Sequence, residues 1–504
     1  MNMAEEAKKK NTLWNFVDSF EGDKVVWMIV ILLILFSIVA IFSSTSLLAL
    51  QQHISRMAIV REQLILSAGG LAVIIICYAI PKIGVFRIFS QLGYIVSIAP
   101  LLLLLAGSLV CRRTGGEELQ IGFVTAQKIN SAWRTLEVFG VQIHVFEIVK
   151  VAMVMYLSWA VNAFRNDSFG IANKLGEKHD FWKKPIVKKI AYIYFPIFSV
   201  CLCIMVGSLS STVFIGAIMF ATILIGGISM KELIKPIGVA AVFLLCLIGI
   251  NTCFEAGHKP FPHLDSALNR ITEESIESKL DIMRDNPRNS KAFQDAYDDV
   301  KQPLSAKIAI HEGGFFGKGP GRSTQRYVVP IMFEDYMFSF VVEEYGMLGG
   351  IFIIILYISL LARGSIIVRN CDNHFAKTAV AGLVLLITGQ AMMHIAVNCD
   401  MGPLTGQTLP MISHGSSSFL MFSLAFGIIL SISKMAKRKI DREAAKATPL
   451  VDRVIKDEVS GGLDDLDRME SGVTEDFATL EDEGGVPVHE NDIPDYGTDD
   501  HNNE

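Results

Sequence analysis

Long runs of apolar residues, separated by shorter polar segments, dominate this chain from about residue 25 to residue 433. A helix crosses a hydrocarbon core of roughly 30 Å with about 20 apolar residues, and ten runs approach that length. They cover residues 25–48, 62–80, 89–110, 142–163, 190–207, 211–229, 234–254, 334–361, 375–398 and 414–433. The pattern predicts an all-α, polytopic membrane protein with about ten transmembrane helices.

The fifth and sixth runs are separated only by the sequence GSLSST at 207–212. This break is compatible with two separate helices, with one broken helix or with a single long hairpin. A count of nine spans would place the two termini on opposite sides of the membrane, so this break bears on the topology.

Basic residues are distributed unevenly between the polar segments. If there are ten spans, one side of the membrane collects most of the Lys and Arg residues, including the three lysines at 8–10 and the cluster at 434–439. The short loops of the other side carry only Arg56, Arg61, Arg112, Arg113, Lys128 and Arg134. The positive-inside rule then predicts that both termini are cytoplasmic and that the long polar loop at about 256–332 is extracytoplasmic.

These patterns divide the chain into three regions. Residues 1–24 form a cytoplasmic N-terminal segment, residues 25–433 the transmembrane domain, and residues 434–504 a cytoplasmic tail. The tail begins basic, which suits anionic headgroups, and continues acidic with few aromatic residues, which predicts disorder. Within the long loop, residues 269–284 have apolar positions near helical spacing, which predicts either an amphipathic helix on the membrane surface or a solvated one.

Composition agrees with a membrane protein and excludes other classes. The 504 residues are 51% hydrophobic with a mean hydropathy of +0.43, and the net charge of −6 leaves no basic excess for nucleic acid. The eight cysteines are scattered without a metal-binding spacing, so we interpret them as packing residues. The N-terminal segment is too polar for a cleaved signal, and we expect the first span to be retained.

The acidic pair Glu334 and Asp335 stands where the long polar loop meets the eighth apolar run. Ionisable residues at the boundary of the hydrocarbon core are functional candidates by default. Asp335 is either an N-terminal helix cap or a general base that takes a proton from an acceptor hydroxyl. Glu343 and Glu344 follow two turns deeper in the same run.

Two other apolar runs also carry polar residues. Glu147 and Lys150 are three apart and share a helix face, so they either form a packing ion pair or hold an anionic lipid headgroup. Gln390, His394 and Asn398 are spaced by four and form a polar stripe. Hydrogen bonds between helices would explain such a stripe without any ligand.

Four motifs follow one another in a characteristic order. They are NSAWRTLEVFGVQIHVFEIVK (130–150), AIHEGGFFGKGPG (309–321), VPIMFEDYMFSFVVEEYGMLGG (329–350) and MGPLTGQTLPMISHGSSS (401–418). Together they resemble the SEDS family (shape, elongation, division and sporulation), the FtsW/RodA type of peptidoglycan glycosyltransferase. The resemblance covers roughly residues 20–435. The chain departs from the family pattern at His144–Phe146, at 207–212, at Ile331 and at 415–417.

The resemblance implies polymerisation of lipid II into glycan strands at the outer face of the membrane. In that scheme Asp335 is the catalytic base, Lys150 and Arg270 neutralise phosphate charge, and Trp133 packs on lipid or sugar. The substrate-binding residues predicted in this way are Trp133, Glu147, Lys150, Arg270, Glu343, Glu344 and His394. A divalent cation, Mg²⁺ or Mn²⁺, at the pyrophosphate is compatible with the scheme, although no cluster of metal ligands in the sequence demands it.

The resemblance also implies partners and a location. We expect a class B penicillin-binding protein as the transpeptidase partner, further cell-division proteins, and a place in the bacterial cytoplasmic (inner) membrane. The long cytoplasmic tail favours the division type, like FtsW, over the elongation type, like RodA. The competing interpretations are a lipid II flippase, which needs charges along the whole crossing path, and a non-catalytic scaffold that acts through its tail.

Overall fold

The computed structural model of the chain describes residues 21–45, 55–80, 82–114, 118–129, 132–253, 276–329, 332–402 and 405–440, with a few isolated positions between them. Helices dominate the described part, as the hydrophobic pattern predicts. The mostly helical fold is therefore confirmed. Arg270 and nearly all of the predicted tail at 434–504 lie outside the described residues.

Nine helical segments in the described part are long and apolar enough to cross a membrane. They are Lys24–Ser44 (α2), Arg56–Ala79 (α4), Ile83–Cys111, Val145–Arg165 (α7), Pro185–Met205, Met230–Asn251, Met337–Asn370 (α17), His374–Asn398 (α18) and the last helix, Ser416–Ile440. Three of these segments differ in their bounds from the individual helices. Ile83–Cys111 comprises Ile83–Gln91 (α5) and most of Gly93–Thr114 (α6). Pro185–Met205 comprises Pro185–Lys189 (α9), the π-helix Ile190–Tyr194 (η2) and Phe195–Met205 (α10), and Met230–Asn251 lies within Met230–Thr252 (α12).

A tenth apolar helix, Leu209–Ile225 (α11), has 17 residues and corresponds to the sixth predicted run. It is a separate helix because α10 ends at Met205 and the side chain of Ser208 caps α11, accepting a hydrogen bond from the Ser211 amide at 3.3 Å. Each of the ten apolar runs thus contributes a helix, and the break at 207–212 joins two helices.

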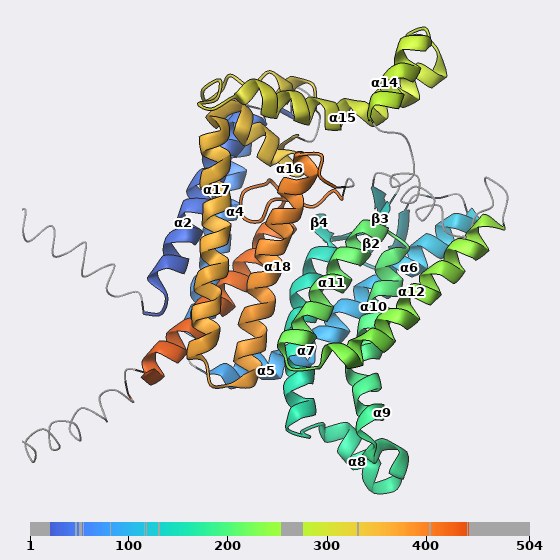
Figure 1. The fold of residues 1–504 in the computed structure, drawn as a ribbon, viewed down its shortest axis with the longest axis vertical. Coiled ribbons are helices and arrows are strands. Elements are labelled where there is room, and N and C mark those ends of the chain that lie inside the picture. The colour runs from blue at the N-terminus through green and yellow to red at the C-terminus, as the bar shows by residue number, and fades with distance from the viewer. Residues whose placement is uncertain are drawn as a thin grey trace, which may run out of the picture. The chain divides into compact units, whose positions relative to one another are not determined.

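Helix α18 lies in the middle of the helical bundle. It packs against α17 on one side and against α7 and α11 on the other. In Figure 1, α2, α4 and α17 lie to one side of α18, whereas α6, α10 and α12 lie to the other. Polar side chains on α18 can therefore reach both halves of the bundle.

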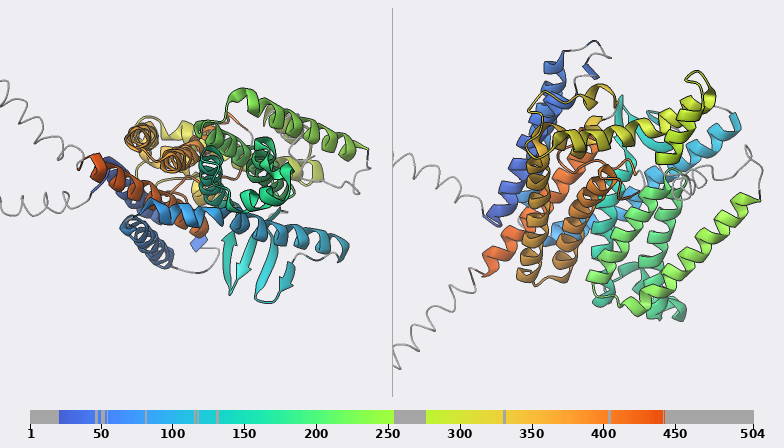
Figure 2. Two further views of the ribbon diagram at one scale, coloured as in Figure 1. Left: turned by 90° about the horizontal axis from the view of Figure 1, so that it is seen from below. Right: turned by 45° about the horizontal axis from the view of Figure 1, so that its top comes forward.

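A four-stranded antiparallel sheet joins α6 to α7, and the sequence analysis did not predict it. Its strands follow the chain order: Glu118–Ile121 (β1), Val124–Ile129 (β2), Ala132–Val138 (β3) and Val141–His144 (β4). The strands are too short to register in a search for apolar runs of membrane length, because side chains alternate between the two faces of a strand. In the left view of Figure 2 the strands project sideways from the helices.

Short helices complete the connections. Gly170–Lys178 (α8) and Asp180–Lys183 (η1) follow α7, and Ile276–Asp285 (α14), Lys291–Gly313 (α15), Gln325–Tyr327 (η3) and Met332–Asp335 (α16) precede α17. Helix α14 begins within the stretch predicted as an amphipathic helix, whose first part lies outside the described residues. Helix α15 packs against α17 (Figure 1).

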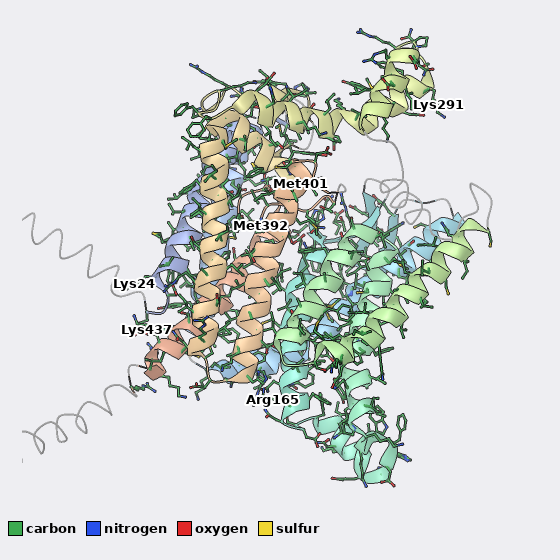
Figure 3. All side chains as sticks on the ribbon, viewed as in Figure 1. Lys24, Arg165, Lys291, Met392, Met401 and Lys437 are labelled. Carbon is green, nitrogen blue, oxygen red and sulfur yellow. The ribbon has the colours of Figure 1, made fainter. Side chains whose placement is uncertain are left out.

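The ends of the helices agree with the uneven distribution of basic residues. Figure 3 places Lys24, Arg165 and Lys437 lower in its view than Met401 and Lys291. Lys24 starts α2, Arg165 ends α7 and Lys437 lies near the end of the last helix. The structure thus brings basic residues from three distant parts of the chain toward one side.

Helix α17 is kinked at Gly346, where φ is 72° and ψ is −175°. The glycine-rich segment after α15 satisfies the backbone groups that the kink leaves without helical partners. The Met347 amide donates to the Gly314 carbonyl at 2.9 Å, and the amides of Lys318 and Gly319 donate to the carbonyls of residues 343 and 344, both at 2.9 Å. A Cβ atom at Gly346 would lie 2.3 Å from the Phe315 carbonyl oxygen. The glycines therefore permit the close contact that holds the kink.

We expect Gly346→Ala to destabilise the protein by about 2–3 kcal/mol, because its backbone conformation is open essentially only to glycine. The measurement is the midpoint of thermal unfolding of the purified protein. Gly69→Ala in α4 is the matched control, since a Cβ there meets no atom within 4 Å. Equal midpoints for the two variants would contradict this account of the kink.

Candidate active site

Asp335 is the last residue of the one-turn helix α16, and α17 begins two residues later, at Met337, after a turn at Tyr336. It therefore stands just before the membrane-spanning helix, whereas the sequence analysis placed it at the start of the eighth apolar run; the turn at Tyr336 separates the two helices. Its side chain is half-buried. Within the described part of the chain, the carboxylate of Asp335 accepts no hydrogen bond.

The first amides of α17 are capped by side chains from α18. The Phe338 amide donates to Nε2 of His394 at 3.3 Å, and the Ser339 amide donates to Oδ1 of Asn398 at 3.0 Å. These are the free N–H groups that a helix cap would otherwise serve. The structure thus favours a role for Asp335 other than helix capping.

The same two side chains fix the backbone on both sides of the site. Asn398 donates through Nδ2 to the carbonyl of Asp335 at 3.2 Å. Because Nε2 of His394 accepts from an amide, its Nδ1 carries the proton and donates to the Gln407 carbonyl at 2.7 Å. His394 is 1% exposed, so in this structure it supports the site from inside the bundle.

Arg134 on β3 is the charged group whose field acts on the Asp335 carboxyl. A Cβ atom on Gly406 would lie 3.8 Å from both Arg134 Nη1 and Asp335 Oδ2, so the two side chains meet at the same glycine. Burial raises the pKa of the Asp335 carboxyl, and the Arg134 guanidinium partly offsets this. Arg134 also has a buried Nε without a hydrogen-bond partner among the described residues.

Glu334 is the second carboxyl at this place. Burial, and then the neighbouring Asp335, raise the pKa of Glu334 to about 7, while Arg134 acts in the opposite direction. The backbone of Glu334 is held by the Ser413 hydroxyl, which donates to its carbonyl at 2.7 Å. The site thus contains two adjacent carboxyl groups whose pKa values are raised and one guanidinium.

Lys150 is buried deeper, beneath this group, and its ammonium has three partners. It donates to Glu147 Oε1 at 2.6 Å, to Gln390 Oε1 at 2.7 Å and to Gln407 Oε1 at 2.8 Å. Gln407 in turn donates to Ser211 Oγ on α11 at 3.1 Å. All three protons of the ammonium are used inside the protein, and the second oxygen of Glu147, Oε2, has no partner among the described residues. The ion pair predicted from the spacing of Glu147 and Lys150 is present.

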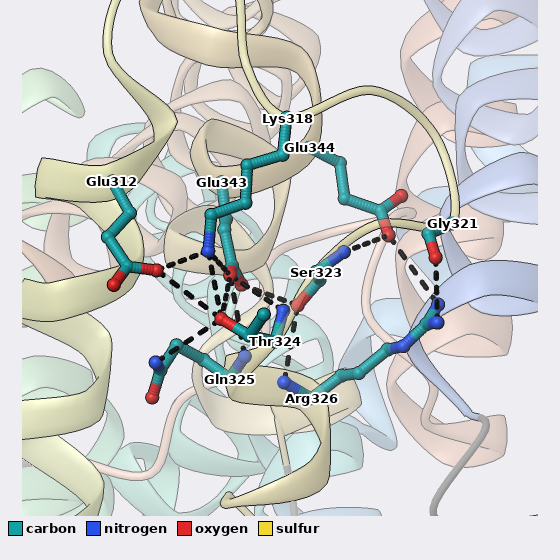
Figure 4. A network of polar contacts seen from close by, with 9 residues as sticks. All are labelled: Glu312, Lys318, Gly321, Ser323, Thr324, Gln325, Arg326, Glu343 and Glu344. Atoms are coloured by element: carbon teal, nitrogen blue, oxygen red, sulfur yellow. Dashed lines mark hydrogen bonds and ion pairs between the residues drawn. The ribbon is translucent and has the colours of Figure 1, made fainter.

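Glu343 and Glu344 belong to a different cluster, shown in Figure 4. Glu343 pairs with Lys318 at 2.7 Å and accepts from the Thr324 amide at 2.8 Å. Glu344 accepts from the Ser43 hydroxyl on α2 at 2.6 Å and lies 3.7 Å from Arg326. Both glutamates are at most 1% exposed. In this structure they join α2, α17 and the glycine-rich segment.

Trp133 is also an internal residue in this structure. It is 7% exposed and packs on α6, where a Cβ atom on Gly107 would lie 3.0 Å from its ring. It precedes Arg134 on β3 and so fixes the strand that carries the guanidinium to Asp335. Arg270 lies outside the described residues, and its predicted contact with phosphate stays a prediction.

Sequence reasoning missed Arg134, Gln407 and Gly406 as parts of this site. Arg134 was counted only as a loop charge, although it follows Trp133 in one quoted motif and Gly406 and Gln407 lie in another. A signal was therefore present in the motifs. The motifs do not show, however, that β3 and the loop around Gly406 meet at Asp335.

Comparisons with known proteins match this architecture. The model of the FtsW/RodA/SpoVE family, described as cell cycle proteins, matches residues 23–438. The probable peptidoglycan glycosyltransferase FtsW of Bacillus subtilis (strain 168) is 24% identical over 436 residues, covering 85% of this chain and 94% of that protein. The protein of the same name from Caulobacter vibrioides (strain NA1000 / CB15N) is 38% identical over 134 residues, which is 27% of this chain and 34% of the relative.

A solved structure shares the fold. It is described as "Structural coordination of polymerization and crosslinking by a peptidoglycan synthase complex" and has a TM-score of 0.55 at 17% sequence identity. The match covers 82% of this chain and 98% of that chain. Because the family model spans residues 23–438, and so most of the chain, this protein belongs to the FtsW/RodA/SpoVE family of cell cycle proteins.

Proposed function

We propose that this chain is a peptidoglycan glycosyltransferase that polymerises lipid II into glycan strands. The relatives reported above carry the glycosyltransferase activity in their names. The observation that carries the proposal is Asp335, a half-buried carboxylate just before the membrane helix α17. In the described structure it serves neither as a helix cap nor as an internal hydrogen-bond acceptor.

In the proposed reaction Asp335 takes the proton of the 4-hydroxyl of the acceptor sugar while that oxygen bonds to the anomeric carbon of the donor. The bond from this carbon to the oxygen of undecaprenyl pyrophosphate breaks, and its electron pair leaves with the pyrophosphate. Attack opposite the leaving group inverts the anomeric centre. Burial supports this role, because a base with a raised pKa holds the transferred proton more strongly.

Arg134 is the residue best placed to meet negative charge on the substrate. Its Nη1 lies at the same glycine as the Asp335 carboxylate, and its Nε has no partner among the described residues. A guanidinium binds phosphate oxygens well. Lys150, in contrast, has no free proton in this structure. We therefore assign phosphate contact to Arg134, with Arg270 as a further predicted contact, and an internal role to Lys150.

A divalent cation at the pyrophosphate remains part of the proposal only as a component to test in the assay. Among the described residues, no three His, Cys, Asp or Glu side chains lie close enough together to hold a metal ion. The proposed step therefore uses no metal ligand from this part of the chain.

A lipid II flippase is the rival proposal, and the position of the polar residues argues against it. Lys150 lies about 8 Å from the start of α7 and Gln390 about 12 Å from the end of α18, given a rise of about 1.5 Å per residue. The remaining part of α7, residues 151–164, carries no charged residue. Within α7 the charged residues Glu147 and Lys150 thus lie near the Asp335 end, and no further charged residue follows until Arg165, the last residue of the helix.

The wider setting is also proposed. The protein is a multi-pass membrane protein, and we place it in the bacterial inner membrane with both termini in the cytoplasm, where the excess of basic residues would lie. We propose a class B penicillin-binding protein as its partner. The similar solved structure, titled as a peptidoglycan synthase complex that couples polymerization and crosslinking, supports this choice. The division role, like that of FtsW, remains favoured over elongation.

We expect Asp335→Asn to lower polymerisation of labelled lipid II by about 10²–10⁴-fold, the usual effect of losing a general base. The assay uses the full chain with its class B partner and with transpeptidation blocked, and unfolding midpoints verify the fold. Glu334→Gln is assayed in parallel. If that variant loses activity while Asp335→Asn keeps it, the base is Glu334; if both keep it, the proposed mechanism is wrong.

The pH dependence tests the pairing of Asp335 with Arg134. The base acts when ionised, so the rate is full above the raised pKa of Asp335 and falls as the pH drops through it. Arg134 lowers this pKa, so Arg134→Gln moves the acidic limb of the rate profile to higher pH. Arg165→Gln, at the far end of α7, should leave the limb in place. An unchanged acidic limb in Arg134→Gln would show that Arg134 does not influence the pKa of the catalytic base.

Stability measurements distinguish an internal role of Lys150 from substrate contact. Lys150→Ala leaves the Glu147 carboxylate without its cation and should cost about 3–5 kcal/mol of stability. The double variant Glu147→Gln/Lys150→Met should recover part of that loss. Lys183→Ala, which breaks an exposed pair with Asp180, is the control and should have little effect. Normal stability of Lys150→Ala with lost polymerisation would instead assign Lys150 to the substrate.

A further inference from the structure

The sheet between α6 and α7 has one apolar face and one polar face. Residues directly opposite each other on neighbouring strands share a face, and side chains alternate along each strand. The apolar face consists of Leu119, Ile121, Val124, Ala126, Leu136, Val138, Val141 and Ile143. The polar face consists of Glu118, Gln120, Thr125, Gln127, Thr135, Glu137, Gln142 and His144. The separation is complete over these sixteen positions.

The helices cover only the inner half of the apolar face. Ala126 and Leu136 are 0% and 6% exposed, and a Cβ atom on Gly107 of α6 would lie 3.1 Å from Ala126 Cβ. Toward the hairpin turns the cover ends: Ile121 is 51% exposed and Val141 60%. The outer half of the apolar face is therefore open in the structure.

The two hairpin turns extend this open surface with aromatic rings. Phe123 and Phe139 are 65% and 81% exposed, and their rings stack with centroids 5.0 Å apart. Phe139 has a φ of 52° and is followed by Gly140 at 80°, the pattern of a turn that usually takes Asn-Gly. A bulky residue with positive φ is unfavourable, so the exposed ring at this position points to a contact outside the chain.

The position of the sheet favours the membrane as the contacting surface. Strand β4 ends at His144 and α7 starts at Val145, so Val141 lies only about 13 Å along the chain from the start of a span. The strands run sideways from the helices (Figure 2). The apolar face packs on α6, whose outward residues Leu109 and Val110 are themselves 58% and 44% exposed, as residues that face lipid would be.

We propose that the outer half of this sheet is a membrane anchor that lies in the boundary layer of the leaflet on the Asp335 side. Its apolar face and the rings of Phe123 and Phe139 enter the acyl boundary, and its polar face meets water and headgroups. This is the arrangement by which amphipathic segments bind a bilayer surface. The anchor holds β3, and with it Arg134, at a defined depth beside Asp335.

The test uses photo-cross-linking of the full chain in membranes of an expressing bacterium. The photoreactive residue p-benzoylphenylalanine replaces Phe123 or Phe139, both exposed, so the fold should tolerate it; unfolding midpoints verify this. Gln142 carries the same residue as the matched control, because it is exposed on the polar face beside Val141. Mass spectrometry identifies phospholipid and polypeptide adducts.

We expect phospholipid adducts at positions 123 and 139 in severalfold higher yield than at position 142. Equal yields at all three positions would overturn the proposal, because the sheet would then have no defined orientation toward lipid. Predominant polypeptide adducts at 123 and 139 would overturn it in favour of a protein partner. Absence of adducts there, with a folded protein, would place the rings in water and also overturn it.

Discussion

The burial of one positive charge constrains much of this structure. A lysine inside a helical bundle is stable in its charged form only if oxygen atoms replace the water that it has lost. Glu147, Gln390 and Gln407 supply those oxygens to Lys150, one from its own helix, one from α18 and one from the following loop. The ammonium thereby ties α7, α18 and that loop together, and Gln407 extends the connection to Ser211 on α11.

This connection reaches the candidate catalytic residue through the backbone. Gln407 is preceded by Gly406, beside which Arg134 and Asp335 meet. His394 binds the Gln407 carbonyl and at the same time caps α17. Asp335 is thus positioned from two directions, by the loop that Lys150 holds and by the helix end that α18 caps. Among the described residues its carboxylate accepts no hydrogen bond, as the proposed role requires.

Backbone amides and carbonyls, like buried charges, need partners inside the protein when they are removed from water. An amide or carbonyl without a partner is costly at membrane depth, so irregular backbone occurs there only where other groups satisfy it. Helix α17 is irregular at its start and at Gly346, and in both places another segment provides hydrogen bonds. Glu343 and Glu344 bring the second of these segments into place by binding Lys318 and the backbone at 323 and 324. Residues that look like a substrate site in sequence thus hold the helix in this structure.

The sequence by itself determined the membrane class, the ten apolar runs and the place of Asp335 where a polar loop meets one of them. Hydrophobic runs of membrane length are local properties, and the cost of burying charge in hydrocarbon makes them readable without a structure. The pairing of Glu147 with Lys150 was also readable, because residues three apart in a helix share a face.

Tertiary structure alone decided which polar residues meet. Arg134 and Asp335 are two hundred residues apart in the chain, and only the folding of β3 against α6 and of the loop around Gly406 brings them together. The sheet itself escaped the sequence analysis, since its short alternating strands produce no long apolar run. The role of His394 likewise follows from the tertiary structure, in which both ring nitrogens form hydrogen bonds with the backbone of other segments. Contacts between distant segments arise from packing, and no local pattern of residues contains that information.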